Sequence, residues 1–442
     1  MKKSTKMILL LIAVSMATVF FNCKDSATTA PSNNTDPFNT GGTERNLLVI
    51  ISDIHLGADL SYAEINENRG TLEKFLISVK NGKNVKELIF AGDVIDEWFV
   101  PVSTDTYQGK DQADFVQRVK AANQSIFDVL NSIIQEGKIA VKYVPGNHDL
   151  TITAANIELI LPGISQIRDP ELGLGTYSPV EYPKIAIEHG HRYNFFCAPD
   201  PYSNQAIAPN TITPPGYFFT RIAAQHYAQK NPAAGDSIKA ITQNTSGNDS
   251  QLMLYYYYKV WEWALGKLTI QNKFNDKIIV TNVDGFSQTY SVNDLVPFQT
   301  TPGGEIDVVL YKGIQDNWAQ RQVRNRVPVN IPAQQAILGS ADYKELDLQA
   351  KNQYLLNPNS DKRLVVFGHT HVAKVEVSNN WNGEKSIYAN SGTWIDHNTL
   401  GATSTFLVIK PQTGDTATQT TVSLYNFNNN TANKMAEESI RY

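Results

Sequence analysis

The histidines of this chain are concentrated in short polar motifs. Of eight histidines in 442 residues, six lie in short motifs that also contain aspartate, asparagine or glycine: His55, His148, His189, His191, His369 and His371. Asp53 and His55 are two residues apart, so in extended backbone both side chains project from one face and can converge on one ion. The same spacing separates the last two histidines of the set. Packing does not explain this concentration, and the pattern favours a metal site.

Short, largely apolar runs come directly before these motifs. They cover residues 47–51, 87–91, 139–144, 184–188 and 363–367. Continuous apolar runs rich in β-branched residues and bounded by glycine indicate strands that are buried on both faces. The polar motifs therefore stand at the ends of predicted strands.

Helical periodicity separates the first three runs. One apolar stripe covers residues 72–79 and a second covers residues 115–134. The strand, helix, strand order predicts an α/β core, in which ligands bind beyond the carboxyl ends of the strands. All of the polar motifs are predicted to lie there.

Closely spaced β segments follow Gly368, at residues 374–377, 386–389, 405–409 and 421–425. They indicate a meander in a second sheet. The expected fold class is therefore α/β, a sandwich of two sheets flanked by helices, with the polar motifs along one edge.

The motifs DxH, GDxxD, GNHD, HGH and GHTH follow one another from Asp53 to His371, across nearly the whole folded chain. This order resembles the metallophosphoesterase (calcineurin-like phosphoesterase) superfamily. The resemblance implies two metal ions. It assigns the first ion to Asp53, His55, Asp93 and His371, and the second to Asp93, Asn147, His189 and His369.

The donor set suits particular metals. Imidazoles, carboxylates and one amide oxygen, without a thiolate, suit manganese, zinc or iron better than calcium or copper(I). Two such divalent ions lower the pKa of a shared water and hold the attacking and leaving oxygens in line. The resemblance thus implies hydrolysis of a phosphoester by a hydroxide that bridges the two ions. His148 matches the family histidine that protonates the leaving oxygen, and Asp96 matches the acid that orients it.

Three residues are candidate substrate contacts. Arg192 directly follows the HGH motif, which makes it the best phosphate candidate among the arginines. His191 either touches the phosphate or closes a supporting hydrogen bond. Trp98 either packs against the sheet or contacts the ligand. It completes a GDxxDxW motif that looks closest to the branch of UDP-2,3-diacylglucosamine pyrophosphohydrolases, although the expected export and the length of the insert prevent carrying over that substrate.

A long segment without superfamily motifs interrupts the predicted catalytic core. Residues 197–361 are expected to form an inserted cap or lid, and residues 46–196 and 362–442 form the two parts of the core. The insert contains an aromatic-rich helical pattern at residues 252–268. Aromatic residues at helical spacing are more often core than a ligand platform, and we interpret them so.

The N-terminus has the pattern of an export signal. Three lysines precede an apolar run that is too short to span a bilayer, which predicts a signal over residues 1–22. Cys23 stands where bacterial lipoproteins carry their lipidated cysteine, and residues 23–45 have the composition of a flexible tether. We expect a membrane-anchored lipoprotein in the periplasm, in the outer membrane or at the cell surface.

The charge composition limits the kinds of molecule that the protein is expected to bind. The chain has 38 Lys and Arg against 43 Asp and Glu, a net charge of −5, which excludes the simplest form of nucleic-acid binding because that rests on clustered basic residues. The expected function is hydrolysis of a phosphomonoester or phosphodiester outside the cytoplasm. The alternatives are a nucleotide, nucleotide-sugar or lipid pyrophosphohydrolase and a metal-stabilised surface binding lipoprotein without turnover.

Overall fold

The structure is a computed structural model that describes residues 36–414 and 418–442. The predicted export signal, Cys23 and most of the predicted tether lie outside the described residues, and they stay predictions. Within the described part of the chain, no helix is both long and apolar enough to cross a membrane.

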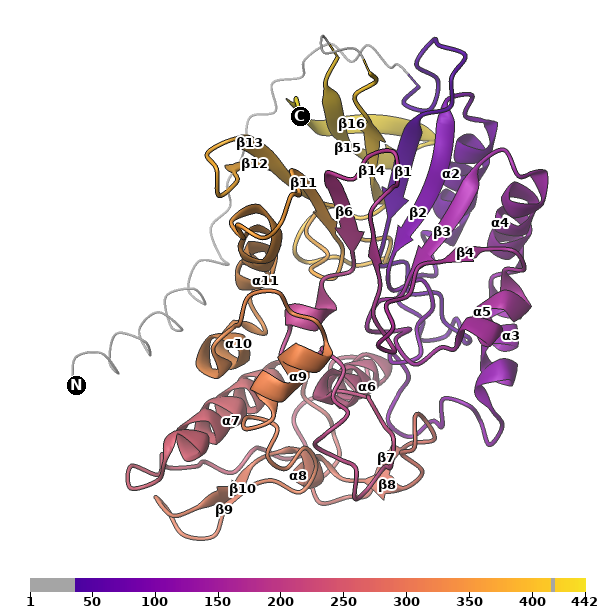
Figure 1. Cartoon of the computed structure of the whole chain (residues 1–442). Helices are drawn as coiled ribbons and strands as arrows, with labels where there is room; N and C mark the ends of the chain where they lie inside the picture. The colour runs from indigo at the N-terminus through magenta and orange to yellow at the C-terminus, as the bar shows by residue number, and fades with distance from the viewer. Residues whose placement is uncertain (1–35, 415–417) are drawn as a thin grey trace, which may run out of the picture. The chain divides into compact units, whose positions relative to one another are not determined.

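A seven-stranded sheet has β1 (Leu47–Ile51) near its centre (Figure 1). On one side, β1 is followed by the parallel strands β2 (Val85–Ala91), β3 (Ala140–Val144) and β4 (Ser165–Gln166). On its other side lie the antiparallel strands β14 (Thr405–Lys410), β15 (Thr420–Asn428) and β16 (Thr431–Ile440). The predicted buried strands before the first three motifs are thus neighbours in one sheet.

A five-stranded sheet carries the last two motifs. Its order is β12 (Lys374–Asn379), β13 (Lys385–Asn390), β11 (Leu364–Phe367), β6 (Ile185–Glu188) and β5 (Thr176–Tyr177). Strands β6 and β11 are parallel, so the HGH and GHTH motifs leave the sheet at the same edge.

The two sheets stack face to face, which confirms the predicted α/β sandwich. Leu48 and Ile50 of β1 share an apolar cluster with Ile187 of β6 and Val366 of β11. Because successive side chains of a strand point to opposite faces, the alternate residues of β1 belong instead to the cluster that the helices cover.

The predicted meander in a second sheet is wrong. Strands β12 and β13 join the five-stranded sheet beside β11, whereas β14 to β16 extend the seven-stranded sheet beside β1. The chain changes sheets between β13 and β14. Alternation of apolar and polar residues gives the face of a strand that is buried, but it does not give the sheet that the strand joins.

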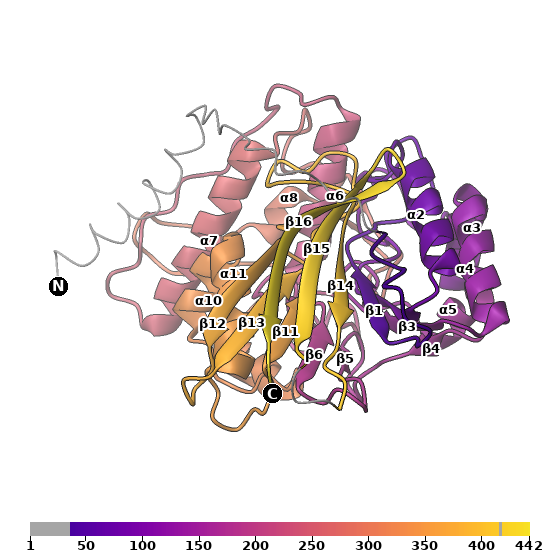
Figure 2. The same cartoon turned by 90° about the horizontal axis from the view of Figure 1, so that it is seen from above.

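Four helices cover the outer face of the seven-stranded sheet (Figure 2). They are α2 (Arg69–Asn81), α3 (Gln112–Ala122), α4 (Gln124–Glu136) and α5 (Ala154–Ile160). The second predicted stripe divides into two helices at Asn123, whose buried amide donates to the carbonyls of Gly57 and Val119. Asn123 therefore ends α3 and ties the helix pair to the loop that follows β1.

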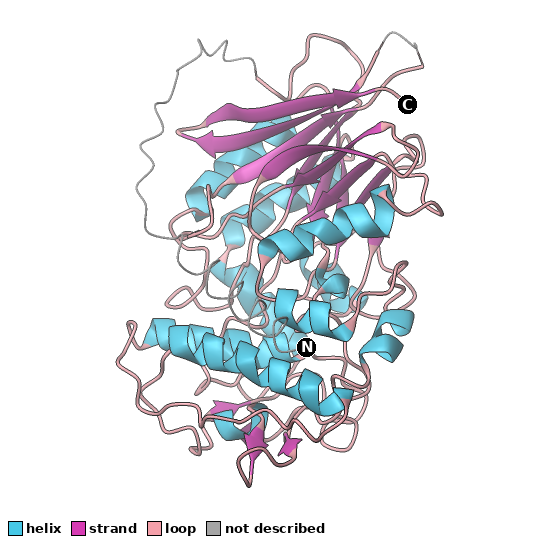
Figure 3. Ribbon diagram, turned by 90° about the vertical axis from the view of Figure 1, so that its left-hand side faces the viewer, coloured by secondary structure: helices cyan, strands magenta, loops and turns pink. Residues whose placement is uncertain are grey.

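The predicted insert forms the lower part of the view in Figure 1 and contains most of the remaining helices (Figure 3). Its helices are α6 (Pro215–Ala228), α7 (Asp249–Lys267), α8 (Val292–Leu295), α9 (Trp318–Arg324), α10 (Ala333–Gly339) and α11 (Tyr343–Ala350), which continues into a π-helical turn at Lys351–Leu355. Two small sheets pair β7 (Ile279–Val280) with β8 (Thr289–Tyr290) and β9 (Phe298–Gln299) with β10 (Ile306–Asp307).

The insert shares one hydrophobic core with the sheets. Tyr257 and Trp261 of α7 are buried in the same cluster as Leu47 and Val49 of β1, so these aromatic residues are core, as their helical spacing predicts. Residues Asp36–Tyr442 form one compact unit. The division of the chain at residues 197 and 361 stays a prediction.

Candidate metal centre

The predicted site residues lie where strands of the two sheets end. Asp53 follows β1, Asp93 follows β2, Asn147 follows β3, His189 follows β6 and His369 follows β11. Strands β1 to β3 are parallel, as are β6 and β11. Each sheet therefore delivers its motifs at the carboxyl ends of its strands, as the α/β pattern predicts.

The backbone of these loops is strained. Five non-glycine site residues have a left-handed backbone: Asp53 (φ 52°), His55 (φ 56°), Asp93 (φ 53°), His369 (φ 67°) and His371 (φ 60°). Bulky residues rarely adopt this conformation, and such strain clusters at functional sites, where the surroundings hold it. Here the N–H of His55 donates to the Asp93 carbonyl at 3.0 Å, and the N–H of Trp394 donates to the Asp53 carbonyl at 3.0 Å.

Asp53, His55 and His371 form the first group of converging donor atoms, which all lie within 4.8 Å of one another. Nε2 of His371 lies 3.2 Å from the Asp53 carboxylate. Nε2 of His55 is buried and has no hydrogen-bond partner among the described residues. A buried, unpaired ring nitrogen beside two carboxylates fits a metal ligand.

Asp53, Asp93 and His189 form the second group. Nδ1 of His189 lies 2.9 Å from the Ala91 carbonyl, which aims Nε2 at Asp93 (3.1 Å) and at the amide oxygen of Asn147 (3.0 Å). A carbonyl behind a histidine in this way is the usual support of a metal-binding imidazole. Asp53 belongs to both groups, and Asp93 also lies 3.8 Å from Nε2 of His55.

The carboxylates of these groups are buried, yet they are ionised. Burial alone raises the pKa of Asp53, but His371 and His189 bring it below its ordinary value. Burial likewise opposes ionisation of Asp93, and its pKa is held well below the ordinary value by His189 and His148. Burial lowers the pKa of His189, but Asp93 and Asp53 raise it to about 9. Two buried anions facing histidines are the charge pattern of a cation site.

His369 lies beside the second group. Among the described residues it is in neither group of converging atoms. Its backbone N–H donates to the Asp53 carboxylate at 3.1 Å, and its ring lies 5.1 Å from the His189 ring. Burial, followed by the charge of His189, lowers the pKa of His369 to about 3. The imidazole is therefore neutral, which is the form that binds metals.

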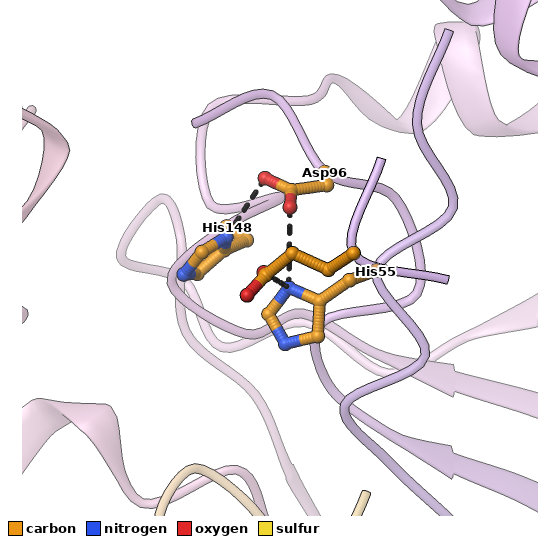
Figure 4. Close-up of side chains that lie close together, drawn as sticks. His55, Asp96 and His148 are labelled. Carbon is orange, nitrogen blue, oxygen red and sulfur yellow. Dashed lines mark hydrogen bonds and ion pairs between the residues drawn. The ribbon is translucent and has the colours of Figure 1, made fainter. Parts of the chain in front are cut away.

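His148 and Asp96 form a hydrogen-bonded pair beside His55 (Figure 4). Nδ1 of His148 lies 2.8 Å from Oδ1 of Asp96, which also accepts the backbone N–H groups of Trp98 and Phe99. Burial lowers the pKa of His148, but the charge of Asp96 raises it above the ordinary value. The Asp96 carboxylate therefore favours the protonated form of an imidazole that lies beside the candidate metal ligands.

Glu64 is a site residue that the sequence analysis missed. Nδ1 of His55 lies between Oδ2 of Asp96 (3.3 Å) and Oε2 of Glu64 (3.2 Å). These two carboxylates fix the tautomer that points Nε2 of His55 inward. Glu64 stands in a loop nine positions after His55 and in no motif, so no sequence signal distinguishes it from a surface glutamate.

Asp149 connects two of the motif loops. Its carboxylate accepts the backbone N–H of Gly146 at 2.7 Å and that of Val94 at 2.9 Å. The N–H of His148 donates in turn to the Asp93 carboxylate at 2.8 Å. These bonds hold the GDxxD and GNHD loops together, so that Asp93 and Asn147 face the same space.

Arg192, the predicted phosphate contact, is engaged by groups of the protein itself. Its guanidinium is buried and pairs with Glu188 at 2.7 Å and Asp169 at 2.8 Å, and it also donates to the Thr176 hydroxyl and the Asn325 carbonyl. Two carboxylates thus neutralise its charge, and its contact with phosphate stays a prediction.

Trp98 and His191 are buried among residues of the site. The Trp98 ring packs against the His148 ring at 5.0 Å and is fully buried, which fits the packing alternative. Nε2 of His191 lies 2.9 Å from the Gly173 carbonyl, and its ring is buried beside His189, which fits the supporting hydrogen bond. Contact of either residue with a substrate stays a prediction.

Residues 47–228 match the family model of the calcineurin-like phosphoesterases. The match supports the metallophosphoesterase superfamily. It spans the DxH, GDxxD, GNHD and HGH motifs and reaches the end of α6, while the GHTH motif lies beyond it. No curated protein matches the chain. The metallophosphoesterase match and the His and Asp clusters together support metal-dependent hydrolysis of phosphoesters.

Proposed function

We propose that this protein is a two-metal phosphohydrolase that cleaves phosphomonoesters or phosphodiesters outside the cytoplasm. The observation that carries the proposal is the convergence of two buried histidine and carboxylate groups, which share Asp53, beside the His148–Asp96 pair. This arrangement contains both parts that phosphoester hydrolysis needs, a cation site for the phosphoryl group and a proton donor for the leaving oxygen.

The residues present fit two divalent transition-metal ions. Asp53, His55 and His371 would hold one ion and Asp93, Asn147 and His189 the other, with His369 reaching the second from the GHTH loop. The donors are nitrogen and oxygen without sulfur, which suits manganese, zinc or iron. Bound there, the ions would supply charge neutralisation at the phosphoryl oxygens and a water of lowered pKa.

The residues of the chain supply the proton. Because Nδ1 of His148 bonds Asp96, Nε2 is the ring atom that gives a proton to the leaving oxygen. Asp96 keeps the ring in this orientation and favours the protonated form. Trp98 packs against the ring and limits its rotation.

Two buried arginines are engaged by the protein itself. Arg192 pairs with Glu188 and Asp169. Arg321 of α9 donates to the carbonyls of Phe195 and Ala198. Because neither guanidinium is free to bind a second phosphate, we place the pyrophosphohydrolase second.

Hydrolysis of aryl phosphates tests the proposal. The wild-type chain with manganese should cleave a nitrophenyl phosphomonoester or phosphodiester, and Asp93→Asn should abolish this activity. A parallel assay with a diphosphate ester separates the pyrophosphohydrolase by its products. Stoichiometric metal without turnover on any of these esters would favour a binding lipoprotein and refute the proposal.

We also propose that the chain is exported and lipidated at Cys23. The support is the charged and apolar N-terminal pattern. Metabolic labelling with palmitate should mark the wild-type chain and leave Cys23→Ser unlabelled and in the non-membrane fraction. Equal labelling of both chains would contradict lipidation at this cysteine.

A further inference from the structure

The end of the insert contacts the loop that carries the last two histidines. Helix α11 packs beside β11, the strand from which the GHTH loop emerges. Two buried side chains, Asp347 of α11 and Asn194, join the end of α10 and helix α11 to this loop. Neither residue belongs to a motif.

Asp347 binds three side chains around the loop. Its Oδ1 accepts the hydroxyl of Thr370 at 3.1 Å and that of Tyr388, and its Oδ2 pairs with Nζ of Lys374 at 2.5 Å. Thr370 is the residue between the two histidines. A buried carboxylate is costly unless its oxygens are paired, so these three bonds fix the loop against α11.

Asn194 makes the second connection. Its Nδ2 lies 3.2 Å from the carbonyl of Ser340 and 3.1 Å from Nε2 of His369, while its Oδ1 accepts the N–H of Phe196. Ser340 directly follows α10. The orientation of the His369 ring is thereby linked to the insert through one amide.

The loop needs such support because its backbone is strained. His369 and His371 both have positive φ, 67° and 60°, and non-glycine residues hold this conformation only where their surroundings fix it. On the side of the sheet, the amide of Asn390 donates to the Gly368 carbonyl and to the Thr370 hydroxyl. On the opposite side the contacts come from the insert.

We propose that residues 340–347 are a fixed brace of the metal centre, and that Asp347 and Asn194 are positioning residues for His371 and His369. The inference rests on the proposed function, because it takes these histidines as metal ligands. It assigns the end of the insert a structural task within the site, in addition to any covering of the substrate.

Hydrogen exchange in the metal-free protein tests the brace directly. In Asp347→Ala, peptides covering residues 368–374 should exchange at least tenfold faster, because Thr370 loses its acceptor. Glu345→Gln is the matched control, since Glu345 lies on the same helix and its carboxylate accepts from the Gln335 amide rather than from the loop. Exchange in this loop that is the same in Asp347→Ala and in the control would overturn the proposal.

Metal affinity gives the second readout. Loss of a partner behind a ligand costs 10-fold to 100-fold in affinity, so Asp347→Ala and Asn194→Ala should each weaken manganese binding by about 10-fold or more. Asp347→Asn keeps an acceptor for Thr370 and should retain most of the affinity. If Asp347→Ala does not fold, Asp347→Asn is compared with Asp347→Leu. Asp347→Leu should then bind manganese more weakly than wild type, and Asp347→Asn should not. A lower melting temperature with unchanged metal affinity would mean a purely structural role and would overturn the proposal.

These measurements separate the brace from the proposed function. If wild-type protein binds manganese and Asp347→Ala weakens it, but no phosphoester is cleaved, the brace stands and the proposed function fails. If wild-type protein binds no metal, the proposed function fails, and the role of these residues as supports of a metal centre fails with it. The exchange rates then show whether the loop itself depends on Asp347.

Discussion

Asp96 is the main cause of the raised pKa of His148. Burial alone would lower the pKa of this imidazole, and the charge of Asp96 at 2.8 Å, with a smaller contribution from Asp93, reverses that effect. The same carboxylate binds the N–H groups of Trp98 and Phe99, so its position is fixed by the backbone of its own loop. A general acid and its orienting carboxylate are thus built as one unit.

Removal of His148 should therefore affect turnover and leave metal binding intact. We expect His148→Ala to lower kcat by about 10²-fold to 10⁴-fold, the usual contribution of a general acid. The loss should be smaller for esters with a good leaving group, since these need less protonation. Equal loss for good and poor leaving groups would contradict the acid role.

The pH profile reports the same pair. The pKa of His148 is raised above the ordinary imidazole value. The ring should therefore be protonated at pH values below the ordinary imidazole pKa, and activity should fall as the pH rises through the raised pKa of His148. In Asp96→Asn the raising charge is absent, and the alkaline limb of kcat against pH should move to lower pH. An alkaline limb at the same pH in both proteins would show that another group limits the rate.

Glu97 is a buried carboxyl whose ionisation opposes folding. Burial raises its pKa to about 7 from 4.5, although Tyr107, Thr151 and Gln112 bind it. Because the folded state binds this proton more tightly, the free energy of unfolding falls as pH rises from 4.5 to 7 and then levels off. The loss is at most about 3 kcal/mol.

Glu97→Gln should remove this dependence. Denaturant unfolding at pH 5 and pH 8 should show a smaller difference in stability for Glu97→Gln than for wild type. The control is Glu73→Gln, because the Glu73 carboxylate lies at the surface of α2 and accepts the Ser125 hydroxyl. An identical pH dependence of wild type and Glu97→Gln would show that Glu97 is ionised throughout.

At the scale of elements, the loops that follow β2 and β3 are closely packed against each other. A Cβ at Gly146 would lie 2.1 Å from Oδ1 of Asp93 and 2.4 Å from its backbone nitrogen. Both neighbours are fixed, because Asp93 also accepts the N–H of His148. The absence of a side chain at Gly146 is what lets Asp93 approach Asn147.

Gly146→Ala should therefore displace Asp93. We expect loss of metal binding and a decrease in stability of about 1–3 kcal/mol, the usual cost of overpacking. Gly70→Ala is the control, because a Cβ at Gly70 in α2 has no neighbour within 4 Å. It should be neutral or slightly stabilising. Unchanged metal binding in Gly146→Ala, measured by titration calorimetry, would contradict this packing.

The sequence predicts where strands lie in the chain better than it predicts which strands pair with each other in a sheet. Strands β1 and β11 are apolar throughout and β2, β3 and β6 largely so, and such runs indicate burial on both faces of a strand. The pairing of β14 with β1 depends on contacts more than 350 residues apart, for which local pattern carries no signal. Strand β16 alternates weakly and is largely polar, so it was not predicted.

At the scale of the whole molecule, the site residues that belong to sequence motifs could be predicted, and those outside motifs could not. Asp53, Asp93 and His189 could be named because their residue types and spacing are specific. Glu64 and Asp347 could not, because each is a single acid outside any motif that reaches the site through the fold. Proximity in sequence does not show which way a side chain turns, and Arg192, which follows the HGH motif, pairs with Glu188 and Asp169.

Metal binding should stabilise the whole chain, because the site draws on both sheets. Divalent metal at 100 times its dissociation constant contributes about 2.7 kcal/mol, so manganese should raise the melting temperature of metal-free wild type by a few degrees. Asp93→Asn should show little or no such shift. An equal shift in Asp93→Asn would place the bound metal elsewhere.

One titration tests the central claim most directly. Metal-free wild-type protein is titrated with manganese, and bound metal and hydrolysis of a nitrophenyl phosphodiester and phosphomonoester are measured on the same samples. The account predicts that hydrolysis appears with bound metal, saturates near two ions per chain and is absent in Asp93→Asn. A chain that binds two ions and cleaves neither ester, or that cleaves them equally well without metal, would contradict it.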